Sequence, residues 1–233
     1  MTVFEEESEP FFELAKNFRD ALLNVQRDEA SRMILKAVEE GMDIKDIYIH
    51  VFESSQHEIG RLWQNNKITV AQEHFCTAAT QMIMSQLYPY IFSTNKNGHR
   101  LVAACAAGEM HEMGVRMVAD IFEMQGWDTY YLGANTPNES IIQTISDLKP
   151  DIIAISASIH YNIAAVKDLI KLIRKNKDIS NTKIIVGGRP FLLSPELWKK
   201  IGADGCPPNA IEALSLADEL ISSKQMAEDS HVH

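Results

Sequence analysis

Apolar residues recur at helical spacing through residues 1–93. Four segments of this region carry apolar side chains three or four positions apart, which is typical of helices that bury one face. These segments begin near Pro10, Asp28, Asp43 and Thr69. Amphipathic helices joined by short connections predict an all-α four-helix bundle over residues 1–93.

Local signals mark the ends of the predicted helices. Asp28 is a candidate N-cap for the second helix, and Gly41 is a candidate stop signal. The third helix is expected to open at Asp43 and to run toward Asn66. Thr69 is followed three residues later by Gln72, the spacing of a capping box, so the fourth helix is expected to begin there.

After a polar stretch at 93–99, the predicted linker, the pattern changes to short apolar runs separated by helical stretches. This alternation predicts βαβ units and a parallel sheet. The expected fold is a flavodoxin-like (Rossmann-type) α/β domain over residues 99–224, followed by a disordered tail over 225–233. Its five strands are expected to begin at Leu101, Thr129, Asp151, Lys183 and Ala203, and a closing helix is expected at 209–222.

Length, charge and cysteine content limit the kinds of partner and the compartment that we expect for this chain. The chain has 233 residues, 45% of them hydrophobic, which is enough to build one large core or two smaller ones. A formal net charge of −10 disfavours direct binding of nucleic acid or of an anionic membrane surface. No window is apolar enough to span a membrane, the acidic N-terminus is unlike a secretory signal, and the cysteines suit a reducing compartment. We therefore expect a cytoplasmic protein.

The predicted loop after the first strand, residues 108–114, reads Gly-Glu-Met-His-Glu-Met-Gly. It lacks the glycine spacing of a dinucleotide-binding loop and the lysine of a P-loop. It offers instead an imidazole, His111, flanked by carboxylates, which suits a metal. Small residues also follow the third and fourth predicted strands, at Ser156–Ser158 and Gly187–Arg189. Loops at the carboxyl ends of parallel strands meet at one edge of the sheet, so these residues predict a deep slot there.

Several short motifs in this half, taken in their order and spacing, resemble the cobalamin-binding domain family over residues 100–222. The first motif is Glu-x-His-x-x-Gly, and a serine follows it 42 residues later, ahead of a Gly-Gly pair. The matching positions are Glu109, His111, Gly114, Ser156, Gly187 and Gly188, with Tyr131-Leu132-Gly133, Thr136-Pro137 and Ile201–Gly205 between and after them.

The resemblance implies a role for each of these residues. His111 would coordinate cobalt from below after the benzimidazole base of the cofactor has swung away, and Glu109 would accept a hydrogen bond from the second ring nitrogen. Ser156 would bond the buried base. The glycines expected to leave room for the nucleotide tail are Gly114, Gly187 and Gly188. Further contacts are implied for Met110, Glu112, Met113, Leu132, Gly133, Ser158 and Arg189.

Two positions depart from the family pattern. Glu109 stands where the family more commonly has Asp, and it is one methylene longer. Ser158 stands where Leu or Thr is usual. Neither change removes the chemistry needed for cobalamin binding, but the contact of Ser158 with the tail differs from the family pattern.

The helical region contains a second set of motif residues. Trp63 is followed ten residues later by Glu73 and His74, which is similar to the cap of light-sensing cobalamin-dependent repressors. There these residues surround the upper axial group of the cofactor, so Trp63, Glu73 and His74 are expected to do so here. Those repressors place a His directly after the Trp, whereas this chain has Gln64, and an amide is a far weaker cobalt ligand.

These features favour a cobalamin-dependent sensor or regulatory module without catalytic residues of its own. The partners expected are cobalamin and a second protein or another copy of the chain. The main alternative is a corrinoid carrier of a methyltransferase system, which resembles this chain in length and in a helical bundle preceding the same sheet. Cofactor storage, another tetrapyrrole ligand and a mutase subunit are further alternatives. The adenosyl, methyl and hydroxo forms of cobalamin are all compatible with the motifs.

Overall fold

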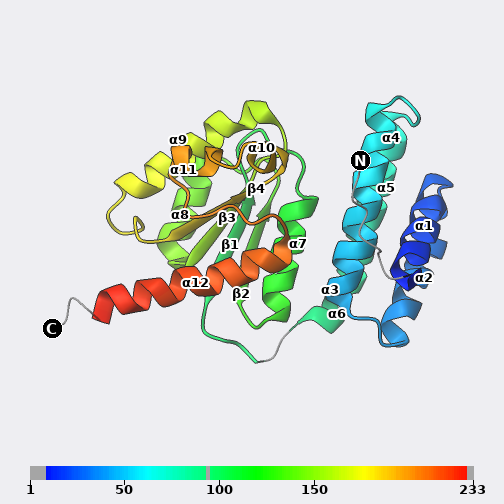
Figure 1. Cartoon of the computed structure of the whole chain (residues 1–233), viewed down its shortest axis with the longest axis horizontal. Helices are drawn as coiled ribbons and strands as arrows, with labels where there is room; N and C mark the ends of the chain where they lie inside the picture. The colour runs from blue at the N-terminus through cyan, green and yellow to red at the C-terminus, as the bar shows by residue number, and fades with distance from the viewer. Residues whose placement is uncertain (1–8, 93–94, 230–233) are drawn as a thin grey trace. The chain divides into compact units, whose positions relative to one another are not determined.

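The structure, a computed structural model, describes residues 9–92 and 95–229 in two units, Met1–Ile91 and Phe92–His233 (Figure 1). The start of the predicted bundle at 1–8 and the first two linker residues, 93–94, lie outside the described residues. No helix of the described part is both long and apolar enough to cross a membrane.

In the N-terminal unit, the described residues form helices joined by short turns. Its apolar stripes form a core in which the ring of Phe52 lies 5.4 Å from that of Phe18 and 5.3 Å from that of Tyr48. The helices are α1 (Glu9–Leu23), α2 (Arg27–Glu39), α3 (Ile44–Asp46), the π-helix η1 (Ile47–Glu53), α4 (Ser54–Gln64), α5 (Val70–Gln86) and α6 (Tyr88–Ile91). Because α3, η1 and α4 follow one another without a break, the unit has four main helical segments and the short α6.

The helix starts match the sequence signals at two of three positions. Thr69 and Gln72 form the predicted capping box of α5, and Asp43 caps α3 by accepting from the Lys45 amide at 2.8 Å. Asp28 is not an N-cap: the cap of α2 is Gln26, without a side-chain bond, and Asp28 lies within the first turn. A carboxylate there still interacts favourably with the helix dipole, so the residue type suits both positions.

The turn between α1 and α2 holds a residue in a strained conformation. Val25 has a φ of +61° and its side chain is 66% exposed. Its amide donates to Leu22 O at 2.9 Å, and the amide of Gln26 donates to Ala21 O at 2.8 Å, which ends α1 in a tight left-handed turn. A β-branched residue rarely adopts this backbone conformation.

The C-terminal unit contains a parallel sheet in the order β2-β1-β3-β4. Its strands are β1 (Arg100–Cys105), β2 (Asp128–Gly133), β3 (Ile152–Ser156) and β4 (Lys183–Gly187). The predicted fifth strand is reduced to a single bridge between Gly205 and Ile185. Prolines at 207 and 208 lack the amide that a longer ladder would require, which explains why pairing stops there.

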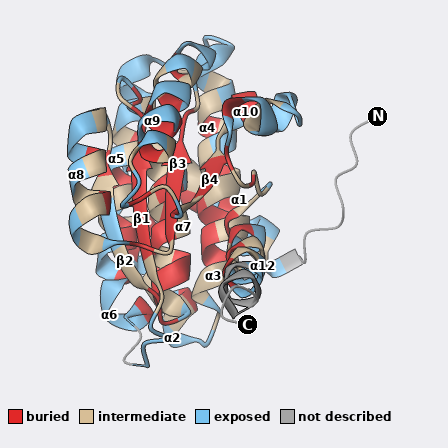
Figure 2. Ribbon diagram, turned by 90° about the vertical axis from the view of Figure 1, so that its left-hand side faces the viewer, coloured by how far each residue is buried: buried red, intermediate tan, exposed pale blue. Residues whose placement is uncertain are grey.

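Helices cover both faces of this sheet (Figure 1). The helices α7 (Met113–Met124) and α12 (Ala210–Asp229) pack on one face, and α8 (Asn138–Leu148) and α9 (Ile163–Lys175) pack on the other. Figure 2 shows the strands as the buried layer between them. Shorter elements are the 3-10 turn η2 (His160–Asn162), α10 (Arg189–Leu193) and α11 (Leu197–Ile201).

The predicted tail over 225–233 is not borne out over its first part. The helix α12 continues to Asp229, and 230–233 lie outside the described residues. The segment 222–229 has no Gly or Pro and contains good helix formers, so nothing in it stops a helix that has already begun.

The stretch just before β1 is fastened to the C-terminal unit. Lys96 donates to the carboxylate of Glu123, which is almost fully buried, and to Trp127 O at 3.0 Å. Gly126 has a φ of +83°, and a Cβ atom there would overlap the carbonyl oxygen of Asn95. Residues 95–99 therefore belong structurally to the α/β unit.

Candidate functional site

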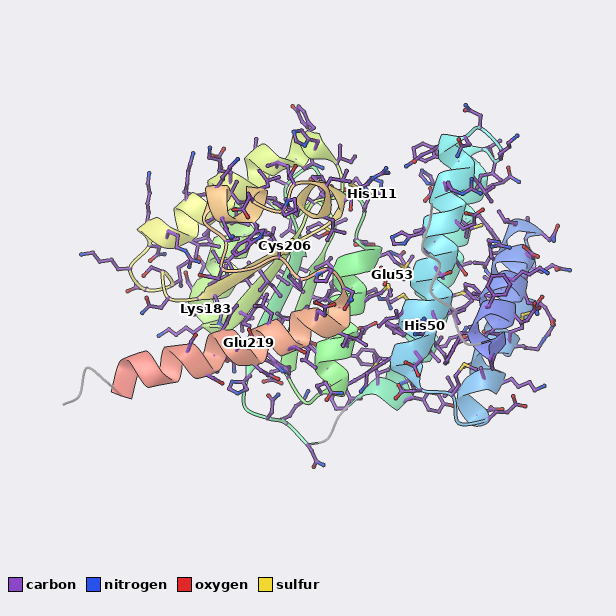
Figure 3. The ribbon with its side chains drawn as sticks, in the orientation of Figure 1. His50, Glu53, His111, Lys183, Cys206 and Glu219 are labelled. Carbon is purple, nitrogen blue, oxygen red and sulfur yellow. The ribbon has the colours of Figure 1, made fainter. Side chains whose placement is uncertain are left out.

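The sheet order places a topological switch point at β1, because β2 and β3 lie on its opposite sides. In such sheets the loops at the carboxyl ends of the diverging strands form the binding edge. The loop after β1 carries His111, and the loop after β3 lies beside it. In Figure 3, His111 lies at the end of the sheet opposite Lys183, the first residue of β4.

The carboxylate of Glu109 joins these two loops. Oε1 accepts from His111, at 2.5 Å from ring Nδ1 and 2.9 Å from the backbone amide. Oε2 accepts from the backbone amides of Ser158 and Ile159, at 2.7 and 3.1 Å. The side-chain amide of Asn162 donates to the same oxygen at 2.9 Å. The predicted contact between Glu109 and His111 is thus present, within a larger network.

This network fixes which ring nitrogen of His111 carries a proton. Burial of Glu109 acts to raise its pKa, but the hydrogen bonds from His111, Asn162 and Ser158 outweigh burial and lower the pKa to about 2. The carboxylate is therefore ionised and can only accept, so Nδ1 of His111 carries the hydrogen. In the neutral ring, Nε2 then holds a lone pair. Nε2 has no hydrogen-bond partner in the described part of the chain, and the side chain is 54% exposed.

The loop after β2 holds the His111 loop from the other side. The side chain of Asn135 accepts from the Gly108 amide at 2.9 Å, and its backbone amide donates to Glu109 O at 2.8 Å. One carboxylate oxygen of Glu112 accepts from the amide of Ala134 at 2.8 Å. Glu112, predicted as a cofactor contact, is therefore engaged with the β2 loop.

The three glycines predicted to leave room differ in their surroundings. A Cβ atom at Gly114 or at Gly187 would meet no atom within 4 Å, so both positions border open space. Gly188 has a φ of +108°, and a Cβ atom there would overlap the carbonyl oxygen of Ala157. The backbone alone therefore requires glycine at 188, whereas among the described residues no contact requires glycine at 114 or 187.

The other predicted contacts lie near the ends of the same strands. Ser156 is buried at the end of β3, in register with Gly187, and Ser158 meets the network through its backbone amide. Leu132 and Gly133 end β2, and Gly133 has a φ of +78°. The remaining predicted positions are Met110 in the loop, Met113 at the start of α7 and Arg189 at the start of α10.

Exposed apolar side chains follow three of the strands at this edge. Met110 is 66% exposed, Tyr161 is 89% exposed and Leu193 is 73% exposed. Single exposed apolar side chains are common on protein surfaces, so these three are candidates for ligand contact by their place after strand ends and not by their exposure. Sequence reasoning missed Tyr161 and Leu193, although both follow predicted strand ends.

In the N-terminal unit, the structure brings Glu73 and His74 together but does not pair them with Trp63. The carboxylate of Glu73 contacts His74 Nδ1 at 2.6 Å and accepts from Thr77 Oγ1 at 3.0 Å. The side chain of Trp63 is 41% exposed and borders an open hollow of about 410 Å³ at the α4–α5 turn. The role of these three residues toward cobalamin stays a prediction.

Two side chains that support the His111 loop were not foreseen. Asn162 lies 53 positions after Glu109, and Asn135 lies 27 positions after Gly108. No local motif marks either asparagine, because each reaches the His111 loop only through the sheet order.

Comparison with known proteins identifies the family. B12 binding domain models match residues 99–215 and residues 14–88, so the chain belongs to the B12-binding family. Two relatives are dimethylamine corrinoid protein 2 of Methanosarcina acetivorans and the dimethylamine corrinoid protein of Methanosarcina barkeri, each 26% identical. Their alignments cover 91% and 90% of this chain and 98% of each relative. The monomethylamine corrinoid protein of Methanosarcina barkeri has the same fold, with a TM-score of 0.79 at 24% identity over 89% of this chain and 98% of that one.

Cobalamin is therefore the cofactor, and the residues at the switch point fit it. Among the described residues there is no group of three or more His, Cys, Asp or Glu side chains that could hold a bare metal ion. A single imidazole with an unpaired Nε2, such as that of His111, would suit a cobalt ion that a macrocycle already holds. Of the two glycines that border open space, Gly114 lies in the first turn of α7, three residues after His111, and Gly187 ends β4 in register with Ser156 of β3.

Proposed function

We propose that this chain is a corrinoid methyl carrier in which His111 is the lower axial ligand. The observation that carries the ligand assignment is the fixed His111 ring, with Nδ1 bound to Glu109 and Nε2 free. Bound cobalamin would supply a cobalt centre able to hold a methyl group between two reactions. The partners would be methyltransferases, and the relatives point to methylated amines as the donor class.

In this proposal the protein's own residues position the ligand. Glu109 sets the tautomer and the angle of the His111 ring, and Asn162 holds the carboxylate of Glu109 from the β3 side. Gly114 and Gly187 would leave space for the displaced nucleotide tail. Ser156 would bond the buried base. Apolar side chains such as Met110 and Tyr161 would exclude water from the edge of the macrocycle.

The relatives favour the carrier over the sensor. The sensor hypothesis depended on the cap residues Trp63, Glu73 and His74. Relatives named as corrinoid proteins align with about nine-tenths of this chain, and so with most of both units. A helical unit before the sheet is therefore not particular to sensors, and Gln64 removes the imidazole on which the light-sensing repressors rely.

The ligand assignment can be tested by electron paramagnetic resonance of the protein loaded with cob(II)alamin. An axial nitrogen of natural abundance splits the cobalt lines into triplets. In protein made with histidine labelled with the heavy nitrogen isotope, we expect doublets, because the axial atom would come from His111 and not from the cofactor. His111→Ala should lose this splitting and bind hydroxocobalamin at least roughly 10-fold more weakly. His160→Ala, which changes another exposed histidine at this edge, serves as the control.

Triplets in the labelled wild-type protein would contradict histidine ligation. A separate experiment distinguishes the carrier from the sensor. The oligomeric state of the protein loaded with methylcobalamin or adenosylcobalamin is measured in the dark and again after illumination. A carrier is expected to keep its oligomeric state. A change that depends on light would support the sensor and count against the carrier.

A further inference from the structure

The loop that holds His111 is tied to the loop after β2 at three points. The side-chain oxygen of Asn135 accepts from the Gly108 amide, and the backbone amide of Asn135 donates to Glu109 O. The third tie is the bond from the Ala134 amide to the carboxylate of Glu112. These ties lie on both sides of His111 in the sequence, so the β2 loop restrains the whole segment 108–112.

The backbone of Asn135 explains why an asparagine can make this connection. Its φ is +49°, in the left-handed region that Asn and Asp tolerate better than other residues with a side chain. In that conformation the side chain and the backbone amide both bond to the neighbouring loop, at 2.9 and 2.8 Å. Gly108, whose amide donates to the Asn135 side chain, also has a positive φ, of +83°. The two loops therefore meet through two left-handed residues.

We infer that Asn135 is a positioning residue for His111: it holds the loop from the β2 side while Asn162 holds Glu109 from the β3 side. This inference rests on the proposed ligation by His111. A metal ligand is held to its geometry by the groups that support it, and losing one such group typically weakens metal binding roughly 10- to 100-fold. The hydrogen bonds that join Asn135 to this loop go to the backbone of Gly108 and Glu109, so it would act on His111 through that backbone.

The test compares three full-length variants. Asn135→Gly keeps the left-handed backbone and removes the side-chain acceptor. Asn135→Asp keeps both the backbone conformation and an oxygen acceptor. Gln143→Ala removes an exposed side-chain amide on α8 that donates to Asp147 of the same helix, and it serves as the matched control. The readouts are hydrogen exchange of the Gly108 amide without cofactor, the dissociation constant of hydroxocobalamin, and the histidine splitting of the cob(II)alamin spectrum.

In Asn135→Gly we expect the Gly108 amide hydrogen to exchange faster than in the wild type. This variant should also bind hydroxocobalamin roughly 10-fold more weakly and show a smaller fraction of histidine-ligated cobalt. Asn135→Asp should restore the exchange rate, the affinity and the histidine splitting to wild-type values, and Gln143→Ala should leave all three unchanged. Equal affinity and equal histidine splitting in Asn135→Gly and the wild type would overturn the inference, and so would a loss that Asn135→Asp does not restore. Absence of histidine splitting from the wild type itself would instead overturn the ligand assignment, and the inference with it.

Discussion

At the scale of single residues, two adjacent glycines at the end of β4 lack side chains for different reasons. The backbone of Gly188 is left-handed and faces the carbonyl oxygen of Ala157, so the chain itself excludes a side chain there. Gly187 has no such restriction and borders open space. Folding of the chain therefore explains the glycine at 188. The glycine at 187 is not explained by the fold and leaves space for a ligand.

This difference predicts opposite results for two alanine substitutions. Gly188→Ala should lower the free energy of unfolding by about 3 kcal/mol, because the backbone must move away from Ala157. Gly187→Ala should change it by less than about 1 kcal/mol and should weaken hydroxocobalamin binding, because the methyl group enters the space proposed for the cofactor. Urea unfolding and cofactor titration measure the two effects. Equal loss of stability in both variants would contradict this distinction.

The core of the site could be predicted from the sequence because its members are close along the chain. Glu109 and His111 are two residues apart on one loop, so a strand followed by this motif already implies their contact. Asn135 and Asn162 could not be predicted in the same way. They lie on different loops, and their approach to residues 108 and 109 follows from the strand order, which periodicity does not reveal.

At the scale of elements, helix and strand types were easier to predict than their irregularities. Apolar residues at helical spacing predicted the four long helical segments, and short apolar runs predicted four of the strands. The π-helix Ile47–Glu53 was not foreseen, because its wider turn leaves a pattern close to that of an ordinary amphipathic helix. The short strand expected at Ala203 is limited to one bridge, at Gly205, because the prolines at 207 and 208 cannot donate to a longer ladder.

The strained turn between α1 and α2 gives a prediction at this scale. Val25→Gly should stabilise the chain by about 1 kcal/mol, because glycine adopts a φ of +61° without steric strain and Val25 is largely exposed. Val25→Ala retains a Cβ atom and serves as the control, with little expected gain. Thermal and urea unfolding of the two variants make the comparison. A destabilised Val25→Gly variant would show that the side chain contributes more than its backbone strain costs.

At the scale of the whole molecule, the segment before β1 fixes where the α/β unit begins. Lys96 is one-third exposed, whereas Glu123 is nearly buried and also accepts from Thr129 at 2.8 Å. Such a carboxylate depends on its cation, because an unpaired charge in a buried position is strongly unfavourable. The contact therefore links the stability of the α/β unit to a residue outside the sheet.

We expect Lys96→Met to destabilise the full chain by about 2 kcal/mol, less than for a fully buried pair because Lys96 is partly exposed. Lys96→Met combined with Glu123→Gln should recover most of this loss, since the buried charge is then gone. Urea unfolding of the two single variants and the double variant measures the coupling. Additive effects would mean that the ion pair contributes no specific stability.

The fastening of residues 95–99 has a practical consequence for anyone who divides this protein. The B12 binding domain match to the C-terminal half begins at residue 99, so a gene cut at that point would discard the lysine that neutralises Glu123. We expect a fragment that starts at residue 95 to resist urea better than one that starts at residue 99, because only the longer fragment keeps Lys96 beside Glu123.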